Sequence, residues 1–403
     1  MKKRIFAAIH YMEIGGAEIS LIGLLHSIDY SRYDVDLFIY SHRGELMEYI
    51  PQQVRILPQD GHYAHLECPI SKTLTDGYFR LGLARLRAKW EYARYIRHNN
   101  PFENYTQFQM TARRTTPILP SLEKYGEYDL AISFLQPHNI VLEKVKAKKK
   151  ICWIHTDYST VNLDADMDLP VWNGYDHIMS ISDSVTDAFL KVFPSLENKM
   201  VVMHNILPQA FVDTRSVQIP QEKIREEMPE EDGVVNLLSI GRYVVQKNFD
   251  NVPHICRLIL DSGCRVRWYI MGWGSEENAI REKIREFGVE ANVILLGKKQ
   301  NPYPYIKACD WYVQPSRYEG NAVTVREAQM LKKPVVITDY ATAPSQVTDG
   351  VDGKIVPLDN AACARGIVSA LGDESLKNNI TAYLSSHSYA NEGEIRVIEN
   401  LIG

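Results

Sequence analysis

Two cations stand five residues apart in the stretch SIGRYVVQKNFD, residues 239–250. The pattern predicts the end of a buried strand, then a glycine and a polar loop that carries Arg242 and Lys247. A guanidinium offers a planar fork of donors and an ammonium a compact charge, so the two together suit a pair of adjacent phosphates. The alternative is two solvated cations on a surface loop.

Two carboxylates flank an expected helix start in QPSRYEGNAVTVREAQ, residues 314–329. Eight positions of helical rise would place Glu319 and Glu327 about 12 Å apart. Two carboxyl groups that cleave one glycosidic bond lie about 5 to 9.5 Å apart, so this pair is too widely spaced for a glycoside hydrolase. The pair suits the two ends of one long ligand. The alternative is an ordinary loop acid and helix acid.

The same stretch predicts a helix N-terminus that a ligand could use. Asn321 is a suitable N-cap, and the backbone N–H groups of Ala322, Val323 and Thr324 would be free at the helix start. A helix N-terminus favours anions. Gly15 and Gly16 predict a second such place, between the first strand and an apolar helix, although a glycine pair is also a common tight turn. The sequence lacks the GxGxxG pattern of a dinucleotide site.

A histidine and three acids complete the candidates. His155 follows the apolar run of KICWIH and would stand at a strand end, where it could face a ligand or fill a structural role. Asp164, Asp166 and Asp168 alternate in LDADMD, which invites a metal interpretation. We interpret these acids as solvated residues of a polar loop, and we expect no metal.

These candidates need strands to position them, and short β-branched runs alternate with helical patterns along the whole chain. This alternation predicts parallel sheets covered by helices. The expected strands are Arg4–His10, Val35–Tyr40, Val54–Leu57, Asp129–Phe134, Lys150–His155, His177–Ile181, Met200–Met203, Val234–Ile240, Val266–Met271, Asn292–Leu296, Trp311–Gln314, Pro334–Thr338 and Lys354–Val356.

The length of 403 residues exceeds one ordinary core and predicts two domains. We expect an N-terminal domain over 1–215 and a C-terminal domain over 216–380, with a final helix over about 380–403 that could pack back on the first. The polar stretch QIPQEKIREEMPEEDG, residues 218–233, is the candidate linker, with a solvated face as the alternative. Two doubly wound domains would leave a ligand cleft at their strand carboxyl ends.

Composition excludes some classes of protein. A net charge of −5 gives no argument for nucleic acid as a partner. Six scattered cysteines form no CxxC pair and indicate reduced thiols in a cytoplasmic protein. The first apolar run is broken at His10 and followed by Glu13, so we expect a strand there instead of a signal peptide. No stretch approaches the roughly 20 apolar residues of a membrane span.

Five motifs together resemble family 4 glycosyltransferases: GGAE, SIGRYVVQKN, YIMGWGSEEN, LLGKKQNPYPYIKACDWYVQPSRYEGNAVTVREAQ and VTDGVDGKIVP, in that order. The resemblance covers nearly all of the second half and, more weakly, both ends of the first. It implies the GT-B fold, with two Rossmann-like domains facing a cleft, and transfer of a sugar with retention. The rivals are a GT-B epimerase or a glycogen-type phosphorylase, and a binding subunit without turnover.

The resemblance also implies a role for each residue. Arg242 and Lys247 would neutralise the diphosphate of a nucleotide-sugar donor, and Glu319 would contact the transferred sugar. Glu327 would bind the ribose, and the loop of Lys298 would hold the base. His155 would lie near the donor sugar, and Gly15 and Gly16 near the phosphates. Asn321 and Ala322 stand where the family usually has a proline-containing turn, which leaves the donor sugar open; UDP-linked hexose is the expected donor.

One helix pattern concerns the acceptor. YFRLGLARLRAKWEYARYIR, residues 78–97, has an apolar stripe at Phe79, Leu83, Leu86, Trp90 and Ala93, with arginines recurring every seven residues beside it. An aromatic and basic helix suits an anionic membrane surface, where lipid-linked saccharide acceptors reside. This interpretation implies peripheral contact with the inner face of the plasma membrane. The alternative is a helix that packs in its domain through this stripe.

Overall fold

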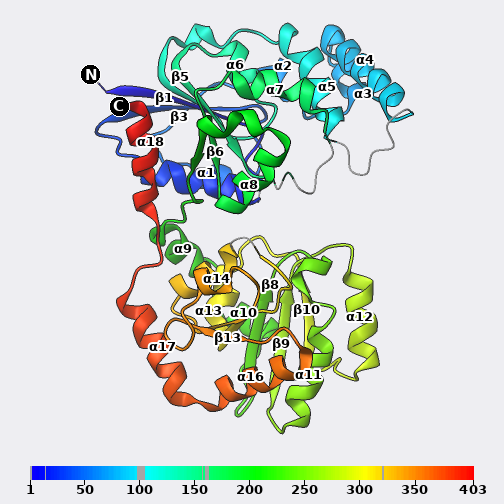
Figure 1. The fold of residues 1–403 in the computed structure, drawn as a ribbon, viewed down its shortest axis with the longest axis vertical. Coiled ribbons are helices and arrows are strands. Elements are labelled where there is room, and N and C mark those ends of the chain that lie inside the picture. The colour runs from blue at the N-terminus through cyan, green and yellow to red at the C-terminus, as the bar shows by residue number, and fades with distance from the viewer. Residues whose placement is uncertain (1, 14, 98–104, 157, 159–162, 320–321) are drawn as a thin grey trace. The chain divides into compact units, whose positions relative to one another are not determined.

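The structure is a computed structural model of the whole chain, and it describes residues 2–13, 15–97, 105–156, 158, 163–319 and 322–403. The chain forms two compact units, one of residues 1–207 with 391–403 and one of residues 208–390 (Figure 1). The first unit therefore ends at residue 207, eight residues before the boundary at residue 215 that was expected from the sequence. The chain returns to the first unit at residue 391.

The first unit is built on a parallel sheet of seven strands in the order β3-β2-β1-β4-β5-β6-β7. Buried apolar runs such as Ile5–Ile9 explain these strands, because a parallel sheet covered on both faces keeps its strands out of water. The strands are β1 (Lys3–Ile9), β2 (Tyr33–Ile39), β3 (Arg55–Ile56), β4 (Tyr128–Ser133), β5 (Ala147–Ile154), β6 (His177–Ser180) and β7 (Met200–Val202). The helices are α1 (Gly16–Ser27), α2 (Gly61–Ala64), α3 (Ile70–Thr75), α4 (Phe79–Ile96), α5 (Thr106–Thr115), α6 (Asn139–Lys144), α7 (Ala165–Asn173), α8 (Asp183–Val192) and α18 (Ile395–Ile402).

The second unit holds a parallel sheet of six strands in the order β10-β9-β8-β11-β12-β13. This is the strand order 3-2-1-4-5-6 of a Rossmann fold, whose ligands bind where the order reverses, here between β8 and β11. The strands are β8 (Val235–Ile240), β9 (Val266–Met271), β10 (Val293–Gly297), β11 (Trp311–Gln314), β12 (Val335–Thr338) and β13 (Lys354–Val356). The helices are α9 (Gln209–Ser216), α10 (Gln221–Glu227), α11 (Val252–Asp261), α12 (Glu277–Glu286), α13 (Tyr303–Ala308), α14 (Val323–Met330), α15 (Ala343–Gln346), α16 (Asn360–Gly372) and α17 (Glu374–Ser386).

The last residues of the chain are fastened to the first unit. The ammonium of Lys149 donates to the Leu401 carbonyl at 2.8 Å, and the Arg32 guanidinium pairs with Glu399 at 2.9 Å. Lys3 donates to the carbonyl of Gly403. Helix α18 therefore lies beside the N-terminal edge of the first sheet, as its position next to β1 in Figure 1 shows.

The expected linker at 218–233 is wrong. Its middle forms helix α10, which contacts α13 in the second unit. Ile224 and Met228 are fully buried, at 0% and 1% exposure, and the Tyr305 hydroxyl donates to Glu227 at 3.0 Å. Two apolar residues four positions apart suffice to bury one face of a short helix, and the surrounding charges and prolines concealed that face in the sequence.

Candidate functional site

The predicted cations and the first predicted acid lie in two loops that follow neighbouring strands of the second sheet. Residues 241–251 follow β8 and carry Arg242 and Lys247, and residues 315–319 follow β11 and carry Glu319. Because β8 and β11 pair in parallel, their carboxyl ends open at the same edge of the sheet. This edge is the position where the strand order reverses. The sequence therefore brings these three residues to the expected ligand position of a doubly wound sheet.

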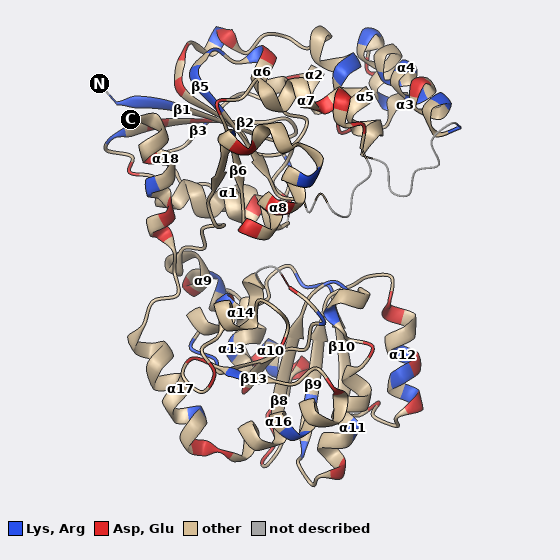
Figure 2. Ribbon diagram, in the orientation of Figure 1, with Lys and Arg blue, Asp and Glu red and all other residues tan. Residues whose placement is uncertain are grey.

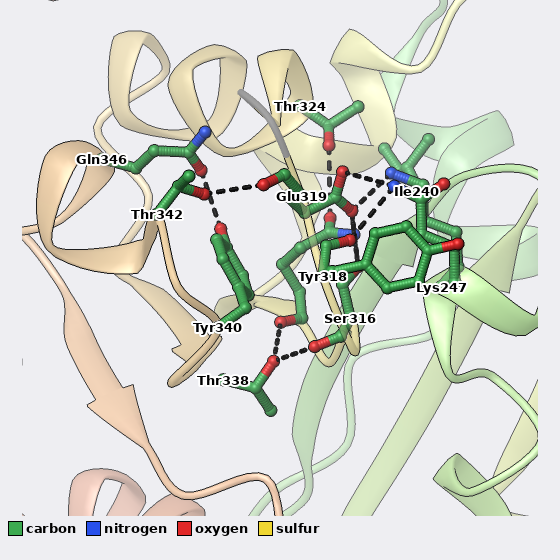
Figure 3. A network of polar contacts seen from close by, with 12 residues as sticks. Ile240, Lys247, Ser316, Tyr318, Glu319, Thr324, Thr338, Tyr340, Thr342 and Gln346 are labelled. Carbon is green, nitrogen blue, oxygen red and sulfur yellow. Dashed lines mark hydrogen bonds and ion pairs between the residues drawn. The ribbon is translucent and has the colours of Figure 1, made fainter. Parts of the chain in front are cut away.

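Lys247 and Glu319 form a buried ion pair at the centre of a polar network (Figure 3). Nζ of Lys247 lies 2.6 Å from Oε1 of Glu319, and the two side chains are only 18% and 6% exposed. The Ser316 hydroxyl donates to the same oxygen at 2.5 Å and the Gln314 amide at 3.2 Å. A buried carboxylate needs such compensation to stay charged. Lys247 and Glu319 thus largely cancel each other's charge before any ligand binds.

Arg242 differs from Lys247, because its side chain is exposed and makes no hydrogen bond or ion pair with any residue that the structure describes. It stands two residues after the end of β8, beyond Gly241. The stem of Lys247 passes within 3.2 Å of where a Cβ at Gly241 would stand, so a larger residue there would push the lysine away from Glu319. The loop therefore presents an uncompensated guanidinium beside a compensated ammonium.

Gln314 and Ser316 were not predicted as site residues, yet they hold Glu319 in place. Both are fully buried, at 0% exposure. The Tyr312 hydroxyl lies 2.7 Å from Gln314 Oε1 and 2.7 Å from the Thr324 hydroxyl, which links this network to the first turn of α14. A signal was present in the sequence, because a glutamine that ends an apolar strand must find buried partners.

The loops after β8, β9 and β10 are clamped together by their backbones. Tyr243 N donates to Trp273 O at 2.8 Å, and Gly272 N donates to Gly297 O at 3.0 Å. A Cβ at Gly274 would lie 2.3 Å from Tyr243 O, so only glycine allows this approach. Lys298 is exposed, with Nζ 4.6 Å from the centre of the Trp273 ring, which is itself half exposed. The indole of Trp273, which was not predicted as a site residue, thus lies at the same edge of the sheet.

Glu327 is buried on α14, at 5% exposure. The Tyr303 hydroxyl donates to its Oε1 at 2.8 Å. Burial raises the pKa of Glu327, while the bond from Tyr303 and the positive charge of Arg215 oppose that rise. One carboxylate oxygen is therefore already bonded within the protein.

Helix α14 begins at Val323 with Ala322 as its N-cap, so the predicted Asn321 cap is wrong by one position; Asn321 itself lies outside the described residues. The physical reason is that Ala322 has the extended backbone of a cap residue, with φ −76° and ψ 94°. Alanine offers no oxygen to the first N–H groups of the helix, and no side chain of Ala322 caps them. The helix start at Val323 is exposed, and no side chain of a described residue caps these donors, so they are available to a ligand.

In the first unit, Gly15 is the N-cap of α1 and Gly16 is its first residue. The Glu18 carboxyl lies where a side chain at Gly15 would be, 2.2 Å from the position of its Cβ. Glu18 is 7% exposed, and burial raises its pKa. The carboxyl group of Glu18 thus occupies the position beside the N-terminus of α1.

His155 lies just past the end of β5 and lines a cavity of about 560 Å³ within the first unit. Its ring is 4.7 Å from that of Phe134 and stacks on Trp153. Burial lowers the pKa of His155 to about 3, so the imidazole is neutral at pH 7. Its Nε2 is buried and has no hydrogen-bond partner among the described residues. An unpaired nitrogen of this kind is suited to a polar ligand in the cavity.

The three aspartates of LDADMD were interpreted as solvated loop residues, and this interpretation is wrong for Asp168. Asp168 is 9% exposed, because α7 turns it inward, and burial raises its pKa to about 6. Asp164 caps α7 by accepting from Met167 N at 3.1 Å, and Asp166 is exposed. Among the described residues, no three His, Cys, Asp or Glu side chains gather as a metal site would require.

Comparison with known proteins places this geometry in a family. Residues 220–386 match the family model described as glycosyl transferases group 1. The capsular polysaccharide biosynthesis glycosyltransferase CapM of Staphylococcus aureus is 26% identical over 208 residues, which cover 50% of this chain and 54% of CapM. The poly(ribitol-phosphate) alpha-N-acetylglucosaminyltransferase of S. aureus is 30% identical over 122 residues, which cover 30% of this chain and 25% of that enzyme. The chain thus spans about a quarter to about half of the length of these relatives.

Solved structures extend the likeness to both units. The structure of Anabaena HepE in complex with UDP and glucose superposes with a TM-score of 0.62 at 16% identity, and the match covers 99% of each chain. Identity this low shows the fold alone, which is GT-B with two Rossmann-like sheets. The fold of the whole chain is that of the GT-B structures. The match over residues 220–386 confirms the family that the sequence motifs indicated for this part of the chain, which belongs to the group 1 glycosyl transferases.

Proposed function

We propose that this chain is a retaining glycosyltransferase that moves a hexose from a UDP-linked donor to a hydroxyl group of a surface glycan or a lipid-linked saccharide. The observation that carries the proposal is the exposed Arg242, which pairs with no described residue and lies beside the Lys247–Glu319 pair, where the strand order of the second sheet reverses. This arrangement supports binding of a diphosphate. The proposed enzyme acts on the cytoplasmic side of the plasma membrane.

The proposed chemistry places charge where the structure has donors. As the bond from the sugar to the diphosphate breaks, negative charge grows on the β-phosphate, and fixed donors stabilise that transition state more than the ground state. Arg242, Lys247 and the free N–H groups at Val323 would supply these donors. In this proposal the side chains do the work that a metal ion does in other enzymes. The new bond forms on the same face of the sugar, and a donor phosphate oxygen takes the acceptor proton.

The remaining site residues have roles along the length of the donor. Glu319 would accept hydroxyl groups of the hexose, and Glu327 would bind the ribose next to Tyr303. Trp273 and Lys298 would lie beside the base. His155 would donate from its neutral imidazole at the sugar end, or accept there with Nε2, which no described residue engages. The glycines at the start of α1 would approach the phosphates. The acceptor would use the cavity of the first unit.

The relatives favour this choice of substrates. HepE was solved with UDP and glucose, which supports a UDP-sugar as donor. CapM is named for the biosynthesis of capsular polysaccharide and the second relative for poly(ribitol-phosphate), which supports a saccharide or polymer acceptor.

A donor screen tests the proposal. Protein unfolding temperatures should rise with UDP-sugars and less with GDP- or ADP-sugars, because a ligand that binds only the folded state stabilises it by mass action. Arg242→Ala should weaken the effect of UDP without changing the stability of the free protein, since the guanidinium pairs with no residue that the structure describes. A protein that no nucleotide stabilises would contradict the proposal, and binding without sugar transfer would indicate a non-catalytic subunit.

The ribose assignment has its own test. Glu327→Ala should weaken UDP binding by calorimetry at least about tenfold, because a buried carboxylate that accepts two ribose hydroxyls is lost. Tyr303→Phe is the matched control, because it removes the same internal hydrogen bond but keeps the carboxylate. Equal affinities in wild type and Glu327→Ala would reject the assignment.

A further inference from the structure

Helix α4 carries a row of large apolar side chains on its outside. Phe79, Leu83, Leu86 and Trp90 are 63%, 61%, 43% and 58% exposed, and their spacing of four, three and four residues aligns them along one face of the helix. We call this row, with its flanking cations, the α4 outer face. The sequence alternative, a helix packed through this stripe, is wrong, because the buried residues of α4 are Leu81, Gly82 and Ala88 on the opposite side.

The side of α4 that faces the protein is firmly held. Arg85 turns inward and donates to the carbonyls of His65 and Cys68, both at 2.7 Å, and to the Thr73 hydroxyl at 3.0 Å. Gly82 lies so close to Leu74 that a Cβ would stand 2.3 Å from its side chain. Helices α3 and α5 both pack against α4. The α4 outer face is therefore exposed although the helix itself is firmly packed against the protein.

Helix α4 carries several cationic residues (Figure 2), and their spacing places them on both flanks of the apolar row. Arg80, Arg87 and Arg94 follow one flank at seven-residue spacing, and Lys89 lies on the other. The single acid of α4, Glu91, is engaged by Arg114 at 2.9 Å and by Arg87 at 3.2 Å. Arg80 and Lys89 form no ion pair with any described residue. The outer face is thus apolar in the middle and positive at its edges.

The apolar row and its cationic edges together limit which partner can cover the α4 outer face. A second copy of the chain would set rows of arginines against each other, with the one acid already engaged. A soluble polyanion would neutralise the cations but leave Leu83 and Trp90 in water. We propose that the α4 outer face docks on an anionic phospholipid bilayer, with the helix in the plane of the interface, its apolar row among the acyl chains and its cations at the headgroups. No helix among the described residues is long and apolar enough to span a bilayer, so this contact is peripheral.

Docking would bring the cavity of the first unit close to the lipid. Arg85 of α4 and Tyr105, Phe108 and Thr111 at α5 line that cavity, so one helix pair forms both the outer face and a cavity wall. A saccharide linked to a lipid would then reach the cavity from the headgroup layer. This consequence rests on the proposed function, whereas the docking itself does not.

Vesicle sedimentation tests the docking. The full chain should pellet with phosphatidylcholine vesicles that contain phosphatidylglycerol, and high salt should reduce the binding. Arg80→Glu with Lys89→Glu, and separately Leu83→Glu with Trp90→Glu, should each weaken binding at least about tenfold. Val217→Glu with Lys223→Glu is the matched control, because Val217 is 64% exposed and Lys223 is an exposed lysine of the second unit. Unfolding temperature and the response to UDP should stay unchanged in all three double variants.

Fluorescence tests the depth of the helix. Lipids with brominated acyl chains should quench the tryptophan fluorescence of the wild type, and Trp90→Phe should still bind vesicles but lose most of the quenching. The proposal is overturned if Leu83→Glu with Trp90→Glu binds vesicles as wild type does, or if Trp90→Phe is quenched equally. It is also overturned if soluble polyphosphate binds with vesicle-like affinity and the apolar variant keeps that binding, or if the wild type is a dimer that this variant dissociates. A loss of UDP response in every variant would instead count against the proposed function.

Discussion

At the scale of single residues, the pairing of Lys247 with Glu319 sets the charge of the site. The pair is nearly neutral, so the net positive charge at the end of β8 comes from Arg242. A diphosphate that binds there must draw Lys247 away from Glu319 or share it. The role of Lys247 in stability and its role in the reaction can therefore be separated by mutation.

Lys247→Ala should lower turnover at least about tenfold and also destabilise the fold by roughly 3 kcal/mol, because it leaves a buried carboxylate without its counter-charge. Adding Glu319→Gln should recover most of the lost stability but none of the activity. Urea unfolding and a sugar-transfer assay measure the two effects. If the double variant is as unstable as Lys247→Ala, the ion pair does not explain the loss.

His138 should make the folding stability of the first unit depend on pH. It is 2% exposed, with Nδ1 2.8 Å from the Ser133 hydroxyl. Burial, with a smaller contribution from repulsion by the neighbouring imidazoles of His155 and His10 in their protonated forms, lowers the pKa of His138 from 6.5 to about 3. Between these pH values His138 binds a proton in the unfolded chain but not in the folded chain. The free energy of unfolding should therefore fall as the pH decreases from 6.5 towards 3.

The variant His138→Gln removes this proton uptake but can keep the bond to Ser133. The difference in free energy of unfolding between wild type and variant should therefore change by up to about 1.4 kcal/mol per pH unit within that window and stay constant above it. Comparing the two proteins cancels the contribution of other groups, including Asp168. Parallel curves through the window would contradict the assignment.

At the scale of elements, the strands could be predicted and the packing of helices could not. Each of the thirteen expected strands lies within three residues of an observed one, because buried parallel strands are continuous apolar runs whatever surrounds them. Helix α10 was missed and the outer face of α4 was left between two interpretations. Both depend on which side of a helix meets the protein, and residues distant in sequence decide that, such as the partners of Arg85.

The same limit applies to the site. The positions of Arg242, Lys247 and Glu319 could be predicted, since parallel strands bring their carboxyl ends to one edge. The contact between Lys247 and Glu319 could not, because it depends on the paths of two loops separated by 72 residues. Gln314 and Ser316 support that contact from a buried strand end, which no spacing rule identifies.

The clamp between loops predicts a sensitive position. Gly274→Ala would force a Cβ against the backbone of Tyr243, which cannot yield as a side chain would. We expect a loss of about 2 kcal/mol of stability and weaker UDP binding, because the strain moves the loop that carries Arg242. Gly372→Ala, at the end of α16 with open space around it, is the control and should be nearly neutral. Calorimetric UDP titration of both variants checks this, and equal behaviour of the two would contradict the clamp.

At the scale of the whole molecule, two doubly wound sheets with separate cores suggest two cooperative units of unfolding. Calorimetry should then show two transitions. Leu21→Ala, in the first unit, and Ile367→Ala, in the second, remove fully buried side chains and identify which transition belongs to which unit.

UDP should raise the temperature of the transition that Ile367→Ala lowers, because Arg242 and Lys247, the cationic side chains proposed to bind the diphosphate, lie in the second unit. At a hundredfold excess over its dissociation constant the nucleotide adds about 2.7 kcal/mol to the stability of the unit that binds it. Arg242→Ala should abolish most of this shift without moving either transition in the absence of nucleotide, which separates lost binding from lost stability. A shift confined to the transition that Leu21→Ala lowers would place the nucleotide on the first unit and contradict the assignment of donor binding to the loops after β8 and β11.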